Sequence, residues 1–171
     1  IFCNSYLPHW RKKRDYKKSS SASRFFGGGV ILDLSHELDY VRYLFGNVSI
    51  KFIVKGKFSN LRINTEDLLK LYGKIKKANL SIDLNYYSKI ERRTLSIDGM
   101  NFSIFADLKK NYLKVKTNNS YYIKKFANTI DDSYVLQHKE ILLGKPKLVC
   151  NYRFALDTMK LIDKIKNKKK N

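Results

Sequence analysis

The chain has 171 residues, of which 43% are hydrophobic and 13% aromatic, a composition typical of a folded domain and unlike that of disordered proteins. None of its apolar runs approaches the roughly 20 residues of a membrane-spanning helix, and its start lacks the pattern of a signal peptide. The net charge of +20 favours polyanionic partners, but lysines occur in every segment, and only residues 11–18 and 164–170 are densely basic.

The first 24 residues predict a strand followed by a polar surface loop. Residues 1–6 have the pattern of a strand that starts at its first residue, as expected of a chain that begins at a domain boundary. Residues 11–24 are polar and contain three successive serines, which favours a loop. Five side chains here combine aromatic rings with guanidinium groups, a set suited to a sugar ring and a phosphate. They are Tyr6, Trp10, Arg11, Arg14 and Tyr16. The alternative is a basic loop in which the aromatic residues are only anchors.

A helix is predicted over residues 29–45, and it carries the most informative side chains. Asp33, His36 and Asp39 recur at intervals of three residues and climb one side of such a helix, while apolar residues between them can face a core. A histidine between two carboxylates is a candidate proton carrier. The alternative is a hydrogen-bonded histidine in a helix that only packs, and spacing alone leaves both interpretations open.

The rest of the chain predicts strands and two closing helices. Alternating apolar and polar residues predict strands over 49–57, 68–75, 80–87, 94–97, 102–105, 112–116 and 121–126. Short connections favour antiparallel pairing in one meander, and helical spacing predicts helices over 133–143 and 153–166. We therefore predict one α+β domain over residues 1–171, with a largely antiparallel open-faced sheet and helices packed on one face. The open face would carry aromatic residues such as Tyr86, Phe102 and Tyr122, which favours a homo-oligomer through that face.

Residues 27–46 contain, in order, Gly27-Gly28-Gly29, Asp33, His36, Glu37-Leu38-Asp39 and Arg42-Tyr43-Leu44. This order resembles the C-terminal domain of the Gfo/Idh/MocA family of NAD(P)-dependent oxidoreductases, in which a glycine stretch opens a helix with an aspartate, a histidine, an acidic-apolar-Asp step and an Arg-aromatic-Leu ending. The likeness continues through residues 6–16, which resemble a loop of a sugar-nucleotide-associated branch of the family. It extends more weakly through residues 83–88 and 93–99, and so covers almost the whole chain.

The resemblance implies a substrate-binding and oligomerisation domain. The intact protein would oxidise a secondary alcohol of a sugar, sugar nucleotide or cyclitol, passing hydride to NAD or NADP while His36 takes the hydroxyl proton. Asp33 or Asp39 would orient the imidazole and stabilise its charged form. The loop that contains Tyr6 and Tyr16 would lie near the substrate pocket.

Two departures from the family pattern limit what the chain can do alone. Asp33 and His36 are three residues apart, closer than the commoner family spacing, which makes the role of His36 a firmer inference than that of Asp33. The family binds its cofactor mainly on an N-terminal Rossmann domain with a Gly-x-Gly-x-x-Gly turn and takes a lysine from a Glu-Lys-Pro segment. This sequence contains neither motif, so we expect no cofactor site in it and no turnover by the isolated chain.

The other chemistry-bearing residues predict no further site. Cys3 and Cys150 lie far apart with no Cys-x-x-Cys pair, so we expect neither a metal site nor a disulfide framework, which favours a reducing cytoplasm. His9 and His138 are isolated and suit surface or capping roles. Two competing hypotheses remain: a basic α+β module that binds single-stranded nucleic acid or another polyanion, and a structural domain in which His36 is inert.

Overall fold

The computed structural model describes residues 1–10, 15–144, 147 and 149–168. They group into two compact units, Ile1–Arg93 with Thr158–Asn171, and Thr94–Asp157. The single domain over residues 1–171 therefore stays a prediction.

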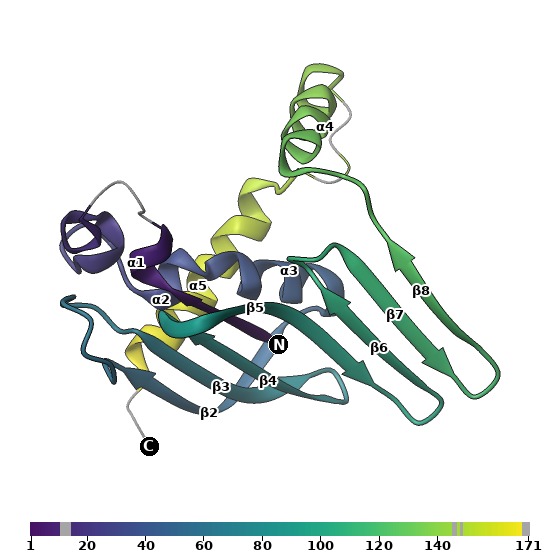
Figure 1. The fold of residues 1–171 in the computed structure, drawn as a ribbon, viewed down its shortest axis with the longest axis horizontal. Coiled ribbons are helices and arrows are strands. Elements are labelled where there is room, and N and C mark those ends of the chain that lie inside the picture. Colours follow the sequence, from purple (N-terminus) through teal and green to yellow (C-terminus); the bar gives the residue numbers. More distant parts are fainter. Residues whose placement is uncertain (11–14, 145–146, 148, 169–171) are drawn as a thin grey trace. The chain divides into compact units, whose positions relative to one another are not determined.

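The first unit contains β1 (Phe2–Tyr6), α1 (Leu7–Trp10), two short 3₁₀ turns (Tyr16–Lys18 and Ser20–Ala22), α2 (Val30–Asp33), α3 (Ser35–Phe45), β2 (Val48–Gly56), β3 (Leu68–Ile75) and β4 (Ala78–Asn85). The second unit contains β6 (Phe102–Asp107), β7 (Tyr112–Thr117), β8 (Tyr121–Lys125) and α4 (Ile130–Leu142). Strand β5 (Tyr87–Asp98) and helix α5 (Tyr152–Asn167) contribute residues to both units (Figure 1). The predicted order of strands and closing helices is confirmed.

The sheet of the first unit runs β2-β3-β4-β1, with β5 beside β1. Pairing is antiparallel from β2 to β3 and from β3 to β4, but β1 is parallel to β4, with Phe2 opposite Asp83. The prediction of one meander is wrong here, because β4 passes into β5 through Tyr86 alone and β1 lies between them. A partner some 80 residues away leaves no mark on local spacing, so the inserted strand could not be read from it.

One face of this sheet forms the core of the first unit. Leu69 and Leu71 of β3 and Leu84 of β4 are fully buried against Leu38 of α3 and Ile162 of α5. Burying each such side chain contributes about 1.5–3 kcal/mol. The opposite face exposes aromatic residues, among them Phe52 and Tyr72. Helices on one face of a mainly antiparallel, open-faced sheet confirm the α+β class.

The predicted helix over residues 29–45 is two helices that meet at Leu34. Leu34 has φ −102° and ψ 22°, and the Glu37 N–H donates to its carbonyl at 3.0 Å, three residues back instead of four. The turn is therefore tighter than in an α-helix. Asp33 ends α2 whereas His36 lies in the first turn of α3, so the argument that one continuous helix face carries Asp33, His36 and Asp39 is wrong.

Close packing explains the glycines before α2. A Cβ on Gly28 would lie 2.1 Å from the Ser20 carbonyl oxygen, and Gly29 has φ +113° and lies against the Glu66 side chain. The Val30 N–H donates to the Glu66 carbonyl at 3.0 Å. Only glycine fits these positions without a backbone shift.

The second unit is an antiparallel meander of β5, β6, β7 and β8 with α4. Helix α4 begins with a capping box between Thr129 and Asp132, and none of its residues is buried. Phe102 and Tyr122 are exposed as predicted, whereas Tyr86, at the β4–β5 junction, is fully buried against Trp10. Placing Tyr86 on the open face was therefore wrong. None of the helices in the described ranges is long and apolar enough to cross a bilayer.

Candidate functional site

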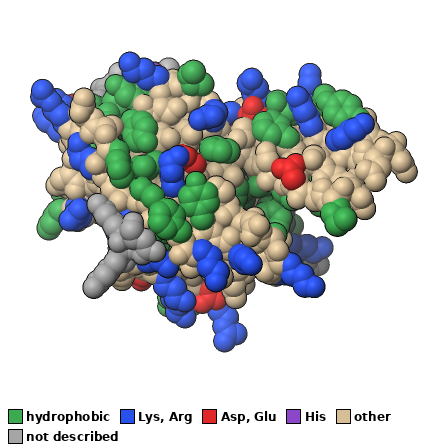
Figure 2. Space-filling model, turned by 90° about the horizontal axis from the view of Figure 1, so that it is seen from below, with side chains coloured by type: hydrophobic (Ala, Val, Ile, Leu, Met, Phe, Trp, Pro, Cys, Tyr) green, Lys and Arg blue, Asp and Glu red, His purple; other side chains and the backbone are tan. Residues whose placement is uncertain are grey.

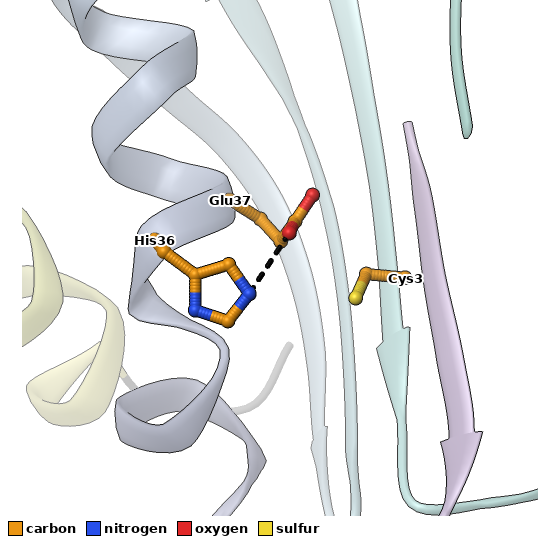
Figure 3. A group of neighbouring side chains, drawn as sticks. All are labelled: Cys3, His36 and Glu37. Carbon is orange, nitrogen blue, oxygen red and sulfur yellow. Dashed lines mark ion pairs between the residues drawn. The ribbon is translucent and has the colours of Figure 1, made fainter. Parts of the chain in front are cut away.

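The candidate site centres on His36 and its neighbour in the sequence. His36 lies in the first turn of α3 with its side chain 48% exposed, whereas the Glu37 side chain is 0% exposed. The imidazole Nε2 lies 3.0 Å from Glu37 Oε1 (Figure 3). An exposed imidazole is thus in polar contact with a buried carboxylate.

Arg93, on the part of β5 that belongs to the first unit, holds the same carboxylate. Its Nε donates to Glu37 Oε1 at 2.7 Å. Burial alone would raise the pKa of Glu37, but the hydrogen bond from His36 and the charge of Arg93 outweigh it, and the pKa lies below its usual value. Burial and the adjacent Glu37 charge raise the pKa of Tyr40, so its hydroxyl stays neutral. The site therefore contains an oriented carboxylate that is ionised at neutral pH.

The contact with Glu37 determines which nitrogen of the imidazole can accept a proton. Glu37 Oε1 accepts a hydrogen bond from Nε2–H, which places the proton of the neutral ring on Nε2 and leaves the Nδ1 lone pair as the proton acceptor. The carboxylate also stabilises the imidazolium that forms when Nδ1 takes a proton. The pair can therefore act as a general base, and in reverse as a general acid.

The two aspartates named from the sequence have other surroundings. Asp39 Oδ1 accepts a hydrogen bond from the Thr158 hydroxyl at 2.7 Å, and Arg42 donates to the same hydroxyl. Asp39 therefore links α3 to α5. Asp33 lies half-buried at the end of α2. Among the described contacts the imidazole pairs with Glu37, which the sequence prediction missed.

Three of the predicted substrate-binding residues, Tyr6, Trp10 and Tyr16, lie in the described part of the first unit. Tyr6 packs edge-on against His9 at 4.7 Å between ring centroids, and Trp10 packs edge-on against buried Tyr86 at 5.3 Å. The Tyr16 hydroxyl accepts the backbone N–H of Arg62 at 3.2 Å. These contacts fit the alternative interpretation, in which the aromatic residues anchor the loop to the core. Substrate binding by these aromatic residues stays a prediction.

Two further members of that predicted set, Arg11 and Arg14, lie outside the described residues. Nothing in the structure bears on their predicted role.

Three potential metal ligands also meet at this site. Cys3 Sγ, a ring nitrogen of His36 and a Glu37 carboxylate oxygen lie within 4.8 Å of one another (Figure 3). Their meeting was not apparent in the sequence, because Cys3 comes from β1. Glu37 Oε1 is already paired with the Arg93 guanidinium, which supplies the positive charge that a metal ion would bring and would repel one.

Comparisons with known proteins agree on the fold. No family model matches the sequence, and no curated protein matches it significantly. A solved structure of UDP-N-acetylglucosamine 3-dehydrogenase from Acidithiobacillus ferrooxidans matches 96% of this chain and 50% of its own, at 10% identity and a TM-score of 0.72. An oxidoreductase from Agrobacterium radiobacter, solved with NAD+, L-tartaric acid and magnesium, matches 95% of this chain and 52% of its own, at 18% identity and a TM-score of 0.70.

The chain therefore has the fold of about half of each of these oxidoreductases, and spans about half of their length. This confirms the fold that the sequence resemblance implied.

Proposed function

We propose that the chain is the substrate-binding half of an oxidoreductase of the Gfo/Idh/MocA type. The reaction transfers hydride between NAD or NADP and a secondary alcohol of a sugar, sugar nucleotide or cyclitol. The fold shared with solved oxidoreductases, one of which is a UDP-sugar 3-dehydrogenase, supports this proposal, as does the histidine motif of α3.

The observation that carries the proposal is the contact of both His36 and Arg93 with the Glu37 carboxylate. Oxidation of an alcohol removes a hydride from carbon and a proton from oxygen, so the enzyme needs a base beside the hydroxyl. Nδ1 of His36 takes that proton, and Glu37, held by Arg93 at 2.7 Å, keeps the imidazole in the required tautomer. In the reverse reaction the same proton returns to the carbonyl oxygen.

The remaining predicted residues have supporting roles in this proposal. Asp39 positions α3 through Thr158, and Asp33 lies half-buried at the end of α2. Tyr6, Trp10 and Tyr16, together with Arg11 and Arg14, contact the substrate. Gly28 and Gly29 do not cradle a phosphate of the dinucleotide, because they pack against Ser20, Ser21 and Glu66. NAD(P) is therefore bound mainly by a Rossmann domain outside this chain.

We also propose a homo-oligomer through the open sheet face. Each unit exposes aromatic side chains on its strands, Phe52 and Tyr72 in the first and Phe102 and Tyr122 in the second. Exposed aromatic surface of this kind favours association with a second protein surface.

The net charge of +20 favours a second candidate, a binding module for nucleic acid. On the face shown in Figure 2, Lys and Arg side chains are scattered among hydrophobic ones and form no continuous track. We therefore expect oligonucleotide binding to be weak, steeply salt-dependent and indifferent to sequence. Tight binding that survives high salt and is lost in Phe102→Ala would favour the nucleic-acid module.

The enzyme proposal is tested on the full-length protein by replacing His36 with asparagine. Turnover of a UDP-sugar with NAD or NADP should fall roughly 10²–10⁴-fold, the usual worth of a positioned acid–base group. The matched control is His138→Asn, since His138 is exposed on α4 and its Nδ1 contacts the Tyr134 carbonyl at 2.7 Å. Equal turnover in the two variants would contradict the proposal.

A further inference from the structure

A basic hollow lies in the first unit, away from the residues so far assigned to proton transfer. Its volume is about 680 Å³, and it is lined by Lys17, Ala22 and Ser23 and by the loop between β2 and β3. The described residues that line it include three cations and two side-chain amides but no carboxylate. These are Lys17, Lys57, Arg62, Asn60 and Asn64.

The loop that forms its floor is held rigidly. Leu61 and Ile63 are buried in the core, so Arg62 between them faces the surface. The fully buried Asp67 carboxylate accepts the N–H groups of Phe58 and Ser59 at 2.7 and 2.9 Å. Since this carboxylate is turned inward and accepts hydrogen bonds from the backbone, it fixes the loop and does not neutralise the cations of the hollow.

Hydrogen bonds tie the two walls of the hollow together. Asn64 Oδ1 accepts the Arg24 N–H at 2.7 Å, and the Arg62 N–H donates to the Tyr16 hydroxyl at 3.2 Å. Because Asn64 uses its oxygen for this contact, its amide nitrogen stays available as a donor to a ligand. The hollow is therefore formed before any ligand arrives, which lowers the entropic cost of binding.

The three cations that line the hollow have few neutralising partners among the described contacts. Lys57 Nζ donates to the Ser59 carbonyl at 2.7 Å, which steers the ammonium without cancelling its charge. Lys17 Nζ lies 3.4 Å from Asp15 Oδ2, so this carboxylate partly neutralises Lys17. Three cations beside one carboxylate leave an excess of positive charge, and Arg62 provides a planar fork that matches phosphate oxygens.

We propose that this hollow binds the phosphate or diphosphate group of a phosphorylated ligand. A neutral sugar or cyclitol needs hydrogen bonds but gains nothing from three cations that line one hollow, whereas a phosphoryl group uses both. In this respect the inference rests on the proposed function and narrows its substrates to phosphorylated ones, such as sugar nucleotides. The same chemistry could bind a phosphate of the dinucleotide cofactor, and the probes below distinguish the two sources.

The test is titration calorimetry of the full-length protein with UDP. The variant Lys57→Ala/Arg62→Ala removes two exposed cations of the hollow. Its matched control is Lys51→Ala/Lys89→Ala, which removes two exposed cations of the same unit that do not line it. We expect the hollow variant to lose at least about tenfold in affinity, given the strength of hydrogen bonds to charged groups, and the control to change by less than about threefold. Equal losses in both variants, or no UDP binding by the wild type, would overturn the inference.

Further probes identify the source of the phosphate. Binding of UDP and inorganic pyrophosphate in preference to adenosine 2′,5′-bisphosphate supports a sugar-nucleotide diphosphate, and the reverse preference supports the phosphate of a dinucleotide. His36→Asn should leave UDP affinity unchanged. If His36→Asn keeps full turnover while the hollow variant still loses UDP, the proposed proton transfer fails and the phosphate site stands.

Discussion

Replacing Glu37 with glutamine should separate the orienting role of this residue from its structural one. Glu37 Oε1 accepts hydrogen bonds from His36 and Arg93 at 3.0 and 2.7 Å. Hydrogen bonds to charged groups contribute about 1.5–3 kcal/mol each, but the His36 and Arg93 side chains are 48% and 37% exposed, so water compensates part of the loss. We expect the free energy of unfolding to fall by about 2 kcal/mol.

The same substitution should change the chemistry. The glutamine amide nitrogen can donate to His36 Nε2, which favours the tautomer with its proton on Nδ1, where the substrate proton should go. We expect kcat to fall roughly 10- to 100-fold with KM changed less than about threefold.

These effects are measured on the full-length enzyme by steady-state kinetics over a pH series and by urea unfolding. The control is Asp98→Asn, because Asp98 accepts a hydrogen bond from Ser103 on an exposed hairpin of the second unit. A Glu37→Gln enzyme that loses stability but keeps the wild-type kcat would refute an orienting role for Glu37.

Three other outcomes follow from the structure. Because the folded-state pKa of Glu37 is lowered, its stabilising contribution is present above the unfolded pKa of about 4.3 and is lost as pH falls through the folded value. In urea unfolding below pH 4.5, the free energy of unfolding of the wild type should therefore approach that of Glu37→Gln. A difference between the two proteins that does not change with pH would contradict this. Gly28→Ala should lower Tm by more than Gly27→Ala, since its Cβ would lie 2.1 Å from the Ser20 carbonyl oxygen whereas a Cβ on Gly27 has no atom within 4 Å; equal Tm values would show that the segment shifts freely. The isolated chain should not bind NADH or NADPH in calorimetry, because Gly28 and Gly29 pack against Ser20, Ser21 and Glu66 and form no phosphate-binding turn; micromolar binding would contradict the proposal that a domain outside this chain binds the cofactor.

Local patterns predicted the elements better than their long-range pairing. Strand β3 has the bounds that alternation indicated, Leu68–Ile75, because Leu69 and Leu71 face the core whereas Tyr72 lies exposed on the other face. The parallel insertion of β1 depends on a pairing between Phe2 and Asp83, which no local pattern encodes. The helix break depends on a tight turn at Leu34, a residue whose type gives no helix-stop signal.

The partner of His36 was, by contrast, accessible from the sequence. Glu37 is three residues after Leu34 and four before Val41, so it shares the face that both bury in the core. A carboxylate at a core position must be paired, and this should have pointed to Glu37 before Asp33 or Asp39. The identity of the cation, Arg93, could not be predicted, because it depends on where β5 crosses the unit.

The central claim is that Nδ1 of His36 takes the substrate proton, and single-turnover kinetics over a pH series test it most directly. Wild-type enzyme preloaded with NAD(P) and mixed with its alcohol substrate should show a hydride-transfer rate that falls at low pH as the imidazole becomes protonated. In His36→Asn the rate should be roughly 10²–10⁴-fold lower and this acidic limb should disappear. An acidic limb of unchanged position in His36→Asn, at a rate close to that of the wild type, would contradict the account.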